Sequence, residues 1–254
     1  MGSCFAQELN GWLRRNEYNC LEHKWGVIYS PQSIAQIVQY SLVRDSWNPD
    51  EPFWVIDGKY HDPYLKSEDH SGPTYRGDDE ASAWRAQEIH FRHSGQLLRQ
   101  AELVVWTLGL TELWRNKRDH AAYYAVPYPG VYDAERHEFY SLTHEDVVQK
   151  LKYAVTTLTS ANPTVTIMLS VSPVPLSISF RAHLGPYIAT QYSKSILHSA
   201  ALATVEKYDN VIYMPSYEIT RNDPIANYKS DGRHVNRECV RVIMEAFKQL
   251  YVLD

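Results

Sequence analysis

The chain has 254 residues, of which 44% are hydrophobic and 22% charged, values that are ordinary for one large globular domain or two small ones. The formal net charge of −5 does not favour binding to nucleic acid. There is no run of 18 or more apolar residues and no basic segment followed by an apolar one, so we expect neither a membrane span nor a signal peptide. The three cysteines are an odd number, which argues against a disulfide framework and favours a cytoplasmic location.

Hydrophobic periodicity predicts helices that alternate with short buried strands along the chain. The helices are expected at 5–16, 33–43, 81–101, 143–161, 192–208 and 236–250, and the strands at 53–60, 103–108, 165–171 and 211–214. Thr143 is the expected N-cap of its helix, with Glu145 and Asp146 in the first turn. This alternation predicts an α/β fold with a parallel sheet covered by helices on both faces, and we expect one domain, 1–254.

Two stretches lack periodicity. Residues 61–79 are rich in Asp, Gly, Pro and Ser and are expected to form a long loop, which in a compact domain is often functional. Residues 116–140 are irregular and are expected to form a lid or rim. Tyrosine and tryptophan are abundant, at nineteen and seven residues, and we assign them to the core rather than to a sugar-binding cleft.

Chemistry-bearing residues gather at the two ends of the chain. Ser3 and Cys4 are two candidate nucleophiles directly after Gly2, and a nucleophile on a tight turn needs a small neighbour. Near the other end, Asp231 and His234 have the spacing of a general base and the carboxylate that orients it. Together the two ends suggest acyl transfer.

The string Gly2-Ser3-Cys4-Phe5-Ala6 gives its name to the GSCFA-domain family, which this chain resembles over nearly its whole length. That family is similar to the SGNH (GDSL-like) hydrolases and acyltransferases. The resemblance continues in 26–34 (GVIYSPQSI), 107–114 (TLGLTELW), 170–174 (SVSPV) and 214–218 (MPSYE). It implies a three-layer α/β/α sandwich around the parallel sheet. We expect the buried strand that leads into the nucleophile turn of such folds to be short or missing here, because only Met1 and Gly2 precede Ser3.

The resemblance also implies catalytic roles. Laid over the Gly-Asp-Ser-hydrophobic block of SGNH enzymes, the string places Cys4 on the nucleophile, whereas a shift of one residue selects Ser3; we favour Cys4. A thiolate there is stabilised by a helix N-terminus and a nearby histidine. His234 becomes the general base and Asp231 its orienting carboxylate. The alternatives are a small buried core cysteine and an Asp that caps the last helix beside an exposed histidine.

An acyl-transfer site needs donors for the developing oxyanion. The resemblance implies Gly26 as the glycine N–H donor, and a Gly-x-Asn-Asp block after the third strand. This chain has Gly109, Leu110, Thr111 and Glu112 there, so Thr111 replaces the asparagine, and its hydroxyl donates only one hydrogen bond. Glu112 either positions Thr111 or the loop, or is a solvated carboxylate.

Three further residues are weaker candidates. His70 lies in the expected long loop, where an exposed histidine is the simpler interpretation. Ser172 follows a predicted strand, where open α/β sheets place ligand-binding loops, and it lines the cleft together with His183 in this hypothesis. No His/Cys/Asp spacing typical of a metal site and no phosphate or dinucleotide fingerprint occurs, so we expect no cofactor.

The sequence thus predicts an esterase (hydrolase) or an O-acyltransferase that acts through an acyl-enzyme on a carbohydrate or small-metabolite ester. Two alternatives stay open: a binding module that kept the cleft and lost turnover, and a cysteine-dependent enzyme of amide or thioester chemistry. The expected partner is a small-molecule or glycan substrate, without nucleic acid. The sequence does not choose between hydrolysis and transfer, nor does it set the oligomeric state.

Overall fold

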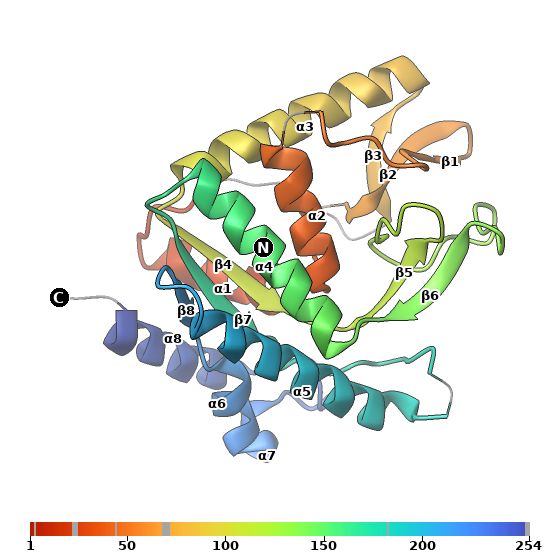
Figure 1. Ribbon diagram of the computed structural model, residues 1–254. Helices are drawn as coiled ribbons and strands as arrows, with labels where there is room; N and C mark the ends of the chain where they lie inside the picture. Colours follow the sequence, from red (N-terminus) through yellow and green to blue (C-terminus); the bar gives the residue numbers. More distant parts are fainter. Residues whose placement is uncertain (3, 22–24, 44, 68–71, 182, 252–254) are drawn as a thin grey trace.

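A parallel three-stranded sheet lies at the centre of the protein in the computed structural model, which describes residues 1–2, 4–21, 25–43, 45–67, 72–181 and 183–251 (Figure 1). Its strand order is β4-β7-β8, and the strands are β4 (Leu103–Leu108), β7 (Thr166–Val171) and β8 (Val211–Tyr213). The ladder pairs Leu103 with Thr166 and Leu108 with Val171, so both strands end at one edge. The predicted parallel sheet is confirmed.

Helices cover both faces of this sheet because side chains alternate along each strand. Trp106 and Leu169 belong to the larger apolar cluster, which includes residues of α2 (Pro31–Leu42), α4 (His144–Ala161) and α5 (Gly185–Val205). Met168 points the other way, into a cluster with residues of α1 (Cys4–Arg15) and α8 (Arg237–Tyr251). Figure 1 shows α2 and α4 in front of the sheet and α1 behind it.

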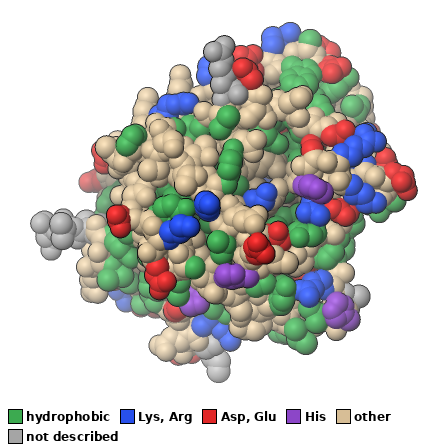
Figure 2. Space-filling view, viewed as in Figure 1, with side chains coloured by type: hydrophobic (Ala, Val, Ile, Leu, Met, Phe, Trp, Pro, Cys, Tyr) green, Lys and Arg blue, Asp and Glu red, His purple; other side chains and the backbone are tan. Residues whose placement is uncertain are grey.

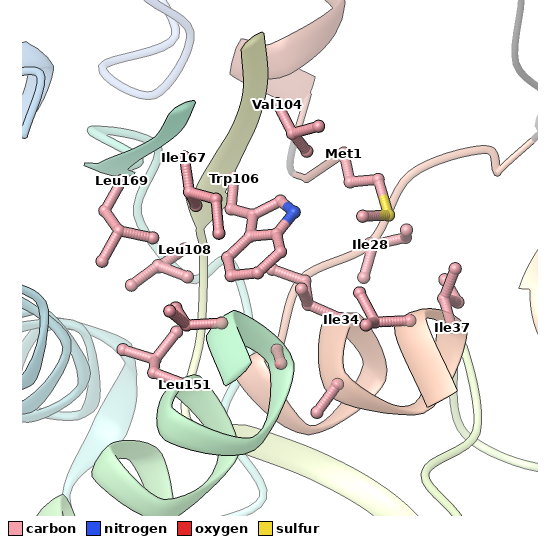
Figure 3. Close-up of a cluster of buried hydrophobic side chains, with 14 of the residues drawn as sticks. Met1, Ile28, Ile34, Ile37, Val104, Trp106, Leu108, Leu151, Ile167 and Leu169 are labelled. Atoms are coloured by element: carbon pink, nitrogen blue, oxygen red, sulfur yellow. The ribbon is translucent and has the colours of Figure 1, made fainter. Parts of the chain in front are cut away.

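The first two residues of the chain, Met1 and Gly2, pair with β4 of the parallel sheet. Gly2 forms a parallel bridge with Thr107, the N–H of Thr107 donates to the carbonyl of Met1 (3.0 Å), and the Met1 nitrogen donates to the carbonyl of Val105 (2.8 Å). On the other side, the N–H of Ile28 donates to the carbonyl of Gly2 (2.8 Å). Figure 3 shows the Met1 side chain near Ile28 and Val104, inside the larger core cluster. Met1 and Gly2 therefore fill the position beside β4 that a longer strand would take.

The prediction of a long loop at 61–79 is wrong. An antiparallel sheet of order β1-β2-β3 occupies this region, with strands β1 (Trp54–Ile56), β2 (Lys59–Lys66) and β3 (Pro73–Gly77). Asp62 looks like a loop residue but is fully buried. Its carboxylate accepts hydrogen bonds from Arg76 (2.8 Å) and Gln87 (2.7 Å), so distant partners satisfy a charge that the local sequence would place in solvent.

A second small sheet frames the irregular stretch predicted at 116–140. It pairs β5 (Glu112–Asn116) antiparallel with β6 (His137–Ser141), so only the connection between the two strands is irregular. Figure 1 places this hairpin beside the β1-β2-β3 sheet, at one end of the parallel sheet.

The predicted helices are present, with two differences. α5 begins at Gly185 rather than 192, because its first turns carry exposed apolar residues such as Tyr187 (91% exposed) that give no periodic signal. Two short helices were not predicted: α6 (Ser216–Asn222) and α7 (Pro224–Asn227). α3 (Glu80–Gln100) and the N-cap of α4 at Thr143 agree with the sequence.

On the face that Figure 2 shows, acidic and basic side chains lie interspersed. None of the helices in the described part of the chain is sufficiently long and apolar to cross a membrane.

Candidate active site at the carboxyl edge of the parallel sheet

A cavity of about 280 Å³ opens where β4 and β7 end. Gly109 directly follows β4 and Ser172 directly follows β7, and both line the cavity. Arg233, from the turn that precedes α8, lines it as well. Ligands of open α/β sheets bind at this edge, so the position agrees with the one predicted for Ser172.

The Asp231–His234 pair lies in that same turn, next to Arg233. Nδ1 of His234 is 2.6 Å from Oδ2 of Asp231, and Oδ1 of Asp231 accepts the N–H groups of His234 and Arg233, each at 2.9 Å. The predicted hydrogen bond is thus present. Both side chains are about half exposed, at 46% and 47%.

These contacts have an electrostatic consequence for the carboxylate. The ring of His234, followed by the two backbone N–H groups, holds the pKa of Asp231 well below its usual range. Asp231 is therefore ionised at neutral pH and accepts the proton on Nδ1 of His234, which leaves Nε2 as the ring nitrogen available to another group.

The other end of the chain arrives at the same edge. Gly2 pairs with Thr107, the penultimate residue of β4, and α1 begins at Cys4 two residues later. Phe5 and Val235, which follow Cys4 and His234 in sequence, pack in one apolar cluster between α1 and α8. The residues that follow Cys4 and His234 thus belong to one apolar cluster. Ser3 and the side chain of Cys4 lie outside the described residues.

The loop after β4 is held from behind by α5. The carbonyl of Gly109 accepts a hydrogen bond from Nζ of Lys194 (2.7 Å), and Oγ1 of Thr111 bonds Oγ of Ser193 (2.8 Å). Lys194 and Thr111 are both fully buried. On the opposite side of the loop, the carbonyl of Tyr29 accepts the N–H groups of Gly109 (2.8 Å) and of the next residue (2.9 Å). The Thr111 hydroxyl, the expected oxyanion donor, therefore binds a partner within the protein.

Glu112 is buried rather than solvated, and it binds the segment after β7 rather than Thr111 or its own loop. Its carboxylate accepts the hydroxyl of Ser179 (2.7 Å) and the N–H of Phe180 (3.3 Å). Both Glu112 and Phe180 line the cavity, so this contact holds part of the segment after β7 in the cavity wall.

The remaining candidates that the structure describes, Gly26 and His183, do not line this cavity. Gly26 lines a second hollow, of about 500 Å³, together with Met1 and Gly2. Its φ is +59°, and a Cβ there would lie 2.3 Å from the carbonyl oxygen of Lys66, so the backbone requires glycine. His183 is exposed. His70 lies outside the described residues.

Sequence reasoning missed Lys194, Ser193 and the aromatic residues of the cavity. One signal for Lys194 was present: it is the single Asp, Glu, Lys or Arg in the 21 residues of α5. The cavity aromatics have no such signal because they come from separate strands and loops. Within the described part of the chain, no group of three or more His, Cys, Asp or Glu side chains is placed to hold a metal ion.

The fold and this site define an α/β protein with a parallel sheet and a histidine–aspartate pair beside a cavity at its carboxyl edge. A family model described as the GSCFA family matches residues 1–247, and the chain belongs to that family. Among the curated proteins, no match was found.

Proposed function

We propose that this protein is an acyl-ester hydrolase or O-acyltransferase that works through an acyl-enzyme. The observation that carries the proposal is the Asp231–His234 hydrogen bond of 2.6 Å, in the turn whose Arg233 lines the cavity. The start of α1 at Cys4, at the same edge of the sheet, supplies the nucleophile turn. By the SGNH resemblance, the substrate is an O-acyl ester of a glycan or a small metabolite.

Two features of the fold support the SGNH-like interpretation. Met1 and Gly2 lie beside β4 where such folds place the strand before the nucleophile, and helices pack on both faces of the sheet as a three-layer sandwich requires.

The proposed reaction has two steps. Nε2 of His234 takes the proton of the Cys4 thiol (or the Ser3 hydroxyl), the new S–C or O–C bond forms at the ester carbonyl, and the ester C–O bond breaks. The proton passes from His234 to the departing alkoxide. Water or an acceptor hydroxyl then gives its proton to His234 and attacks the acyl group, and the nucleophile leaves with that proton restored.

Intact-mass measurement with a panel of activated acyl esters tests the proposal. We expect the mass of one acyl group to be added to the wild-type chain and the adduct to be lost in His234→Ala. Loss in Cys4→Ala with retention in Ser3→Ala assigns the thiol, and the reverse pattern assigns the hydroxyl. An adduct that persists when both residues are replaced contradicts the mechanism.

A binding module is the second candidate, and one observation favours it. Groups that an oxyanion site would use, the Thr111 hydroxyl and the Gly109 N–H, already bind Ser193 and Tyr29. A chain that binds esters in the cavity but forms no adduct with any of them would support this alternative.

A further inference from the structure

Aromatic rings form two walls of the cavity. Tyr64 and Tyr123 stack on each other with ring centroids 5.9 Å apart and an interplanar angle of 12°. Across from the small β1-β2-β3 sheet, Trp114 of β5 contacts Phe180 edge to face, at 5.3 Å and 85°, and Phe139 of β6 packs against the same Phe180 at 5.6 Å. Such pairs give a rigid apolar surface at small cost in side-chain entropy.

Several polar groups in the lining bind partners within the protein, whereas Nε1 of Trp114 and Nε of Arg233 have no hydrogen-bond partner among the described residues. The carboxylate of Glu112 binds Ser179 and the backbone of Phe180, and the hydroxyl of Tyr123 donates to the buried Glu51 (2.6 Å). These atoms would lose hydrogen bonds if they turned to an occupant. The occupant therefore meets mainly ring faces and aliphatic side chains.

The mouth of the cavity is also apolar. Ile178 is 67% exposed and Val126 is 40% exposed, and both belong to the lining. Exposed apolar residues that border a cavity mark the entry of an apolar ligand more often than an isolated surface residue does.

The volume indicates the size of the group that fits. A cavity of about 150 Å³ with an apolar lining holds a benzene molecule. The cavity here measures about 280 Å³, so an acetyl group leaves most of it empty, whereas a benzoyl or butanoyl group fills more of the apolar space.

We propose that this cavity receives the acyl group of the substrate and selects bulky apolar acyl groups, aromatic or at least four carbons long, over acetyl. The inference rests on the proposed acyl transfer. Arg233, the neighbour of His234, marks the reacting end, and the aromatic walls hold the acyl group. Each buried methylene should raise the rate of adduct formation about fourfold, the equivalent of about 0.8 kcal/mol. The two additional methylenes of butanoyl should therefore raise this rate at least tenfold over acetyl.

Rates of adduct formation with 4-nitrophenyl acetate, butanoate and benzoate test this selectivity, each divided by the rate with free cysteine in solution. We expect normalised rates for butanoate and benzoate at least tenfold above acetate. Leu176→Trp, which places a large side chain in the lining, should lower the butanoate-to-acetate and benzoate-to-acetate rate ratios at least tenfold. The control Leu202→Trp, on the exposed side of α5, should leave both ratios unchanged. Thermal melting checks that both variants fold.

Binding of benzamide and acetamide, followed by NMR, separates the two proposals because it needs no reaction. We expect benzamide to bind more tightly than acetamide, and Leu176→Trp to weaken it. Adducts that form equally with all three esters would overturn the selectivity and leave acyl transfer standing. Tight benzamide binding without any adduct would overturn acyl transfer and would support a cavity that binds apolar ligands without reaction. Equal binding of the two amides would overturn the inference itself.

Discussion

The Asp231–His234 hydrogen bond sets the chemistry that His234 can perform. The Asp231 carboxylate fixes the proton on Nδ1, and in the proposed mechanism Nε2 then serves the nucleophile. Asp231→Asn should keep the fold and lower acyl-transfer turnover by about 10²–10⁴-fold. Steady-state rates and thermal melts check this result, with the exposed Asp78→Asn as the matched control. An unchanged rate in Asp231→Asn would mean that Asp231 only shapes the turn.

The thiol of Cys4 provides a second test at the residue scale. If the helix N-terminus and His234 favour its thiolate, iodoacetamide should modify Cys4 well below pH 8.5, the ordinary thiol pKa of about 8.5 being lowered. The chain contains its own controls: Cys20 is partly exposed, and burial raises the pKa of Cys239. Peptide mass mapping at pH 6 to 9 measures all three. Modification of Cys4 only at the pH where Cys20 reacts would contradict an activated thiol.

Gly2 has a packing reason to be glycine, apart from any role in catalysis. A Cβ there would lie 2.0 Å from Oγ1 of Thr107 and 2.6 Å from its carbonyl oxygen, and the φ of +149° is one that L side chains rarely adopt. Gly2→Ala should lower the unfolding free energy by about 1–3 kcal/mol. Gly130→Ala, with nothing within 4 Å of the new Cβ, should stay within about 0.5 kcal/mol of wild type in urea denaturation. Equal stabilities of the two variants would refute the packing argument.

At the scale of elements, α5 supports the loop after β4 through the buried amine of Lys194. Burial lowers the pKa of Lys194 to about 7, while the unfolded chain keeps the ordinary value of about 10.4. Between these values the unfolded state binds more protons, so the unfolding free energy should rise with pH from 7 to 9, by up to about 1.4 kcal/mol per pH unit.

Urea denaturation at pH 7, 8 and 9 measures this rise. Lys194→Met should remove it, whereas the exposed Lys152→Met should retain it. Because the Lys194 Nζ also binds the Gly109 carbonyl, the variant should in addition slow acyl transfer by disturbing the loop. A rise of the same size in wild type and Lys194→Met would show that Lys194 does not titrate in this range.

Elements whose signal is local were predicted best. β4 is a continuous apolar run and agrees with the sequence at both ends, and the capping box of Thr143 and Asp146 starts α4 as expected. β2 was missed because its burial depends on tertiary contacts: Asp62 is stable inside only with Arg76 and Gln87 around it. No sequence pattern within 59–66 predicts those partners.

At the scale of the whole molecule, the proposed site draws on both ends of the chain. The sequence predicted the contact of Asp231 with His234, since both lie in one short turn. It did not predict the cavity walls, because Tyr64, Tyr123 and Phe180 come from distant segments and meet only after the two small antiparallel sheets pack beside the parallel one. Aromatic residues assigned to the core thus also form the candidate binding surface.

The central claim is that the N-terminal turn is acylated with help from His234. Peptide mapping of the chain after reaction with 4-nitrophenyl butanoate tests it most directly. We predict that the butanoyl group lies on residue 3 or 4, that it forms in Asp231→Asn more slowly, and that it is absent in His234→Ala. Acylation confined to exposed lysines, and unchanged in His234→Ala, would contradict the account.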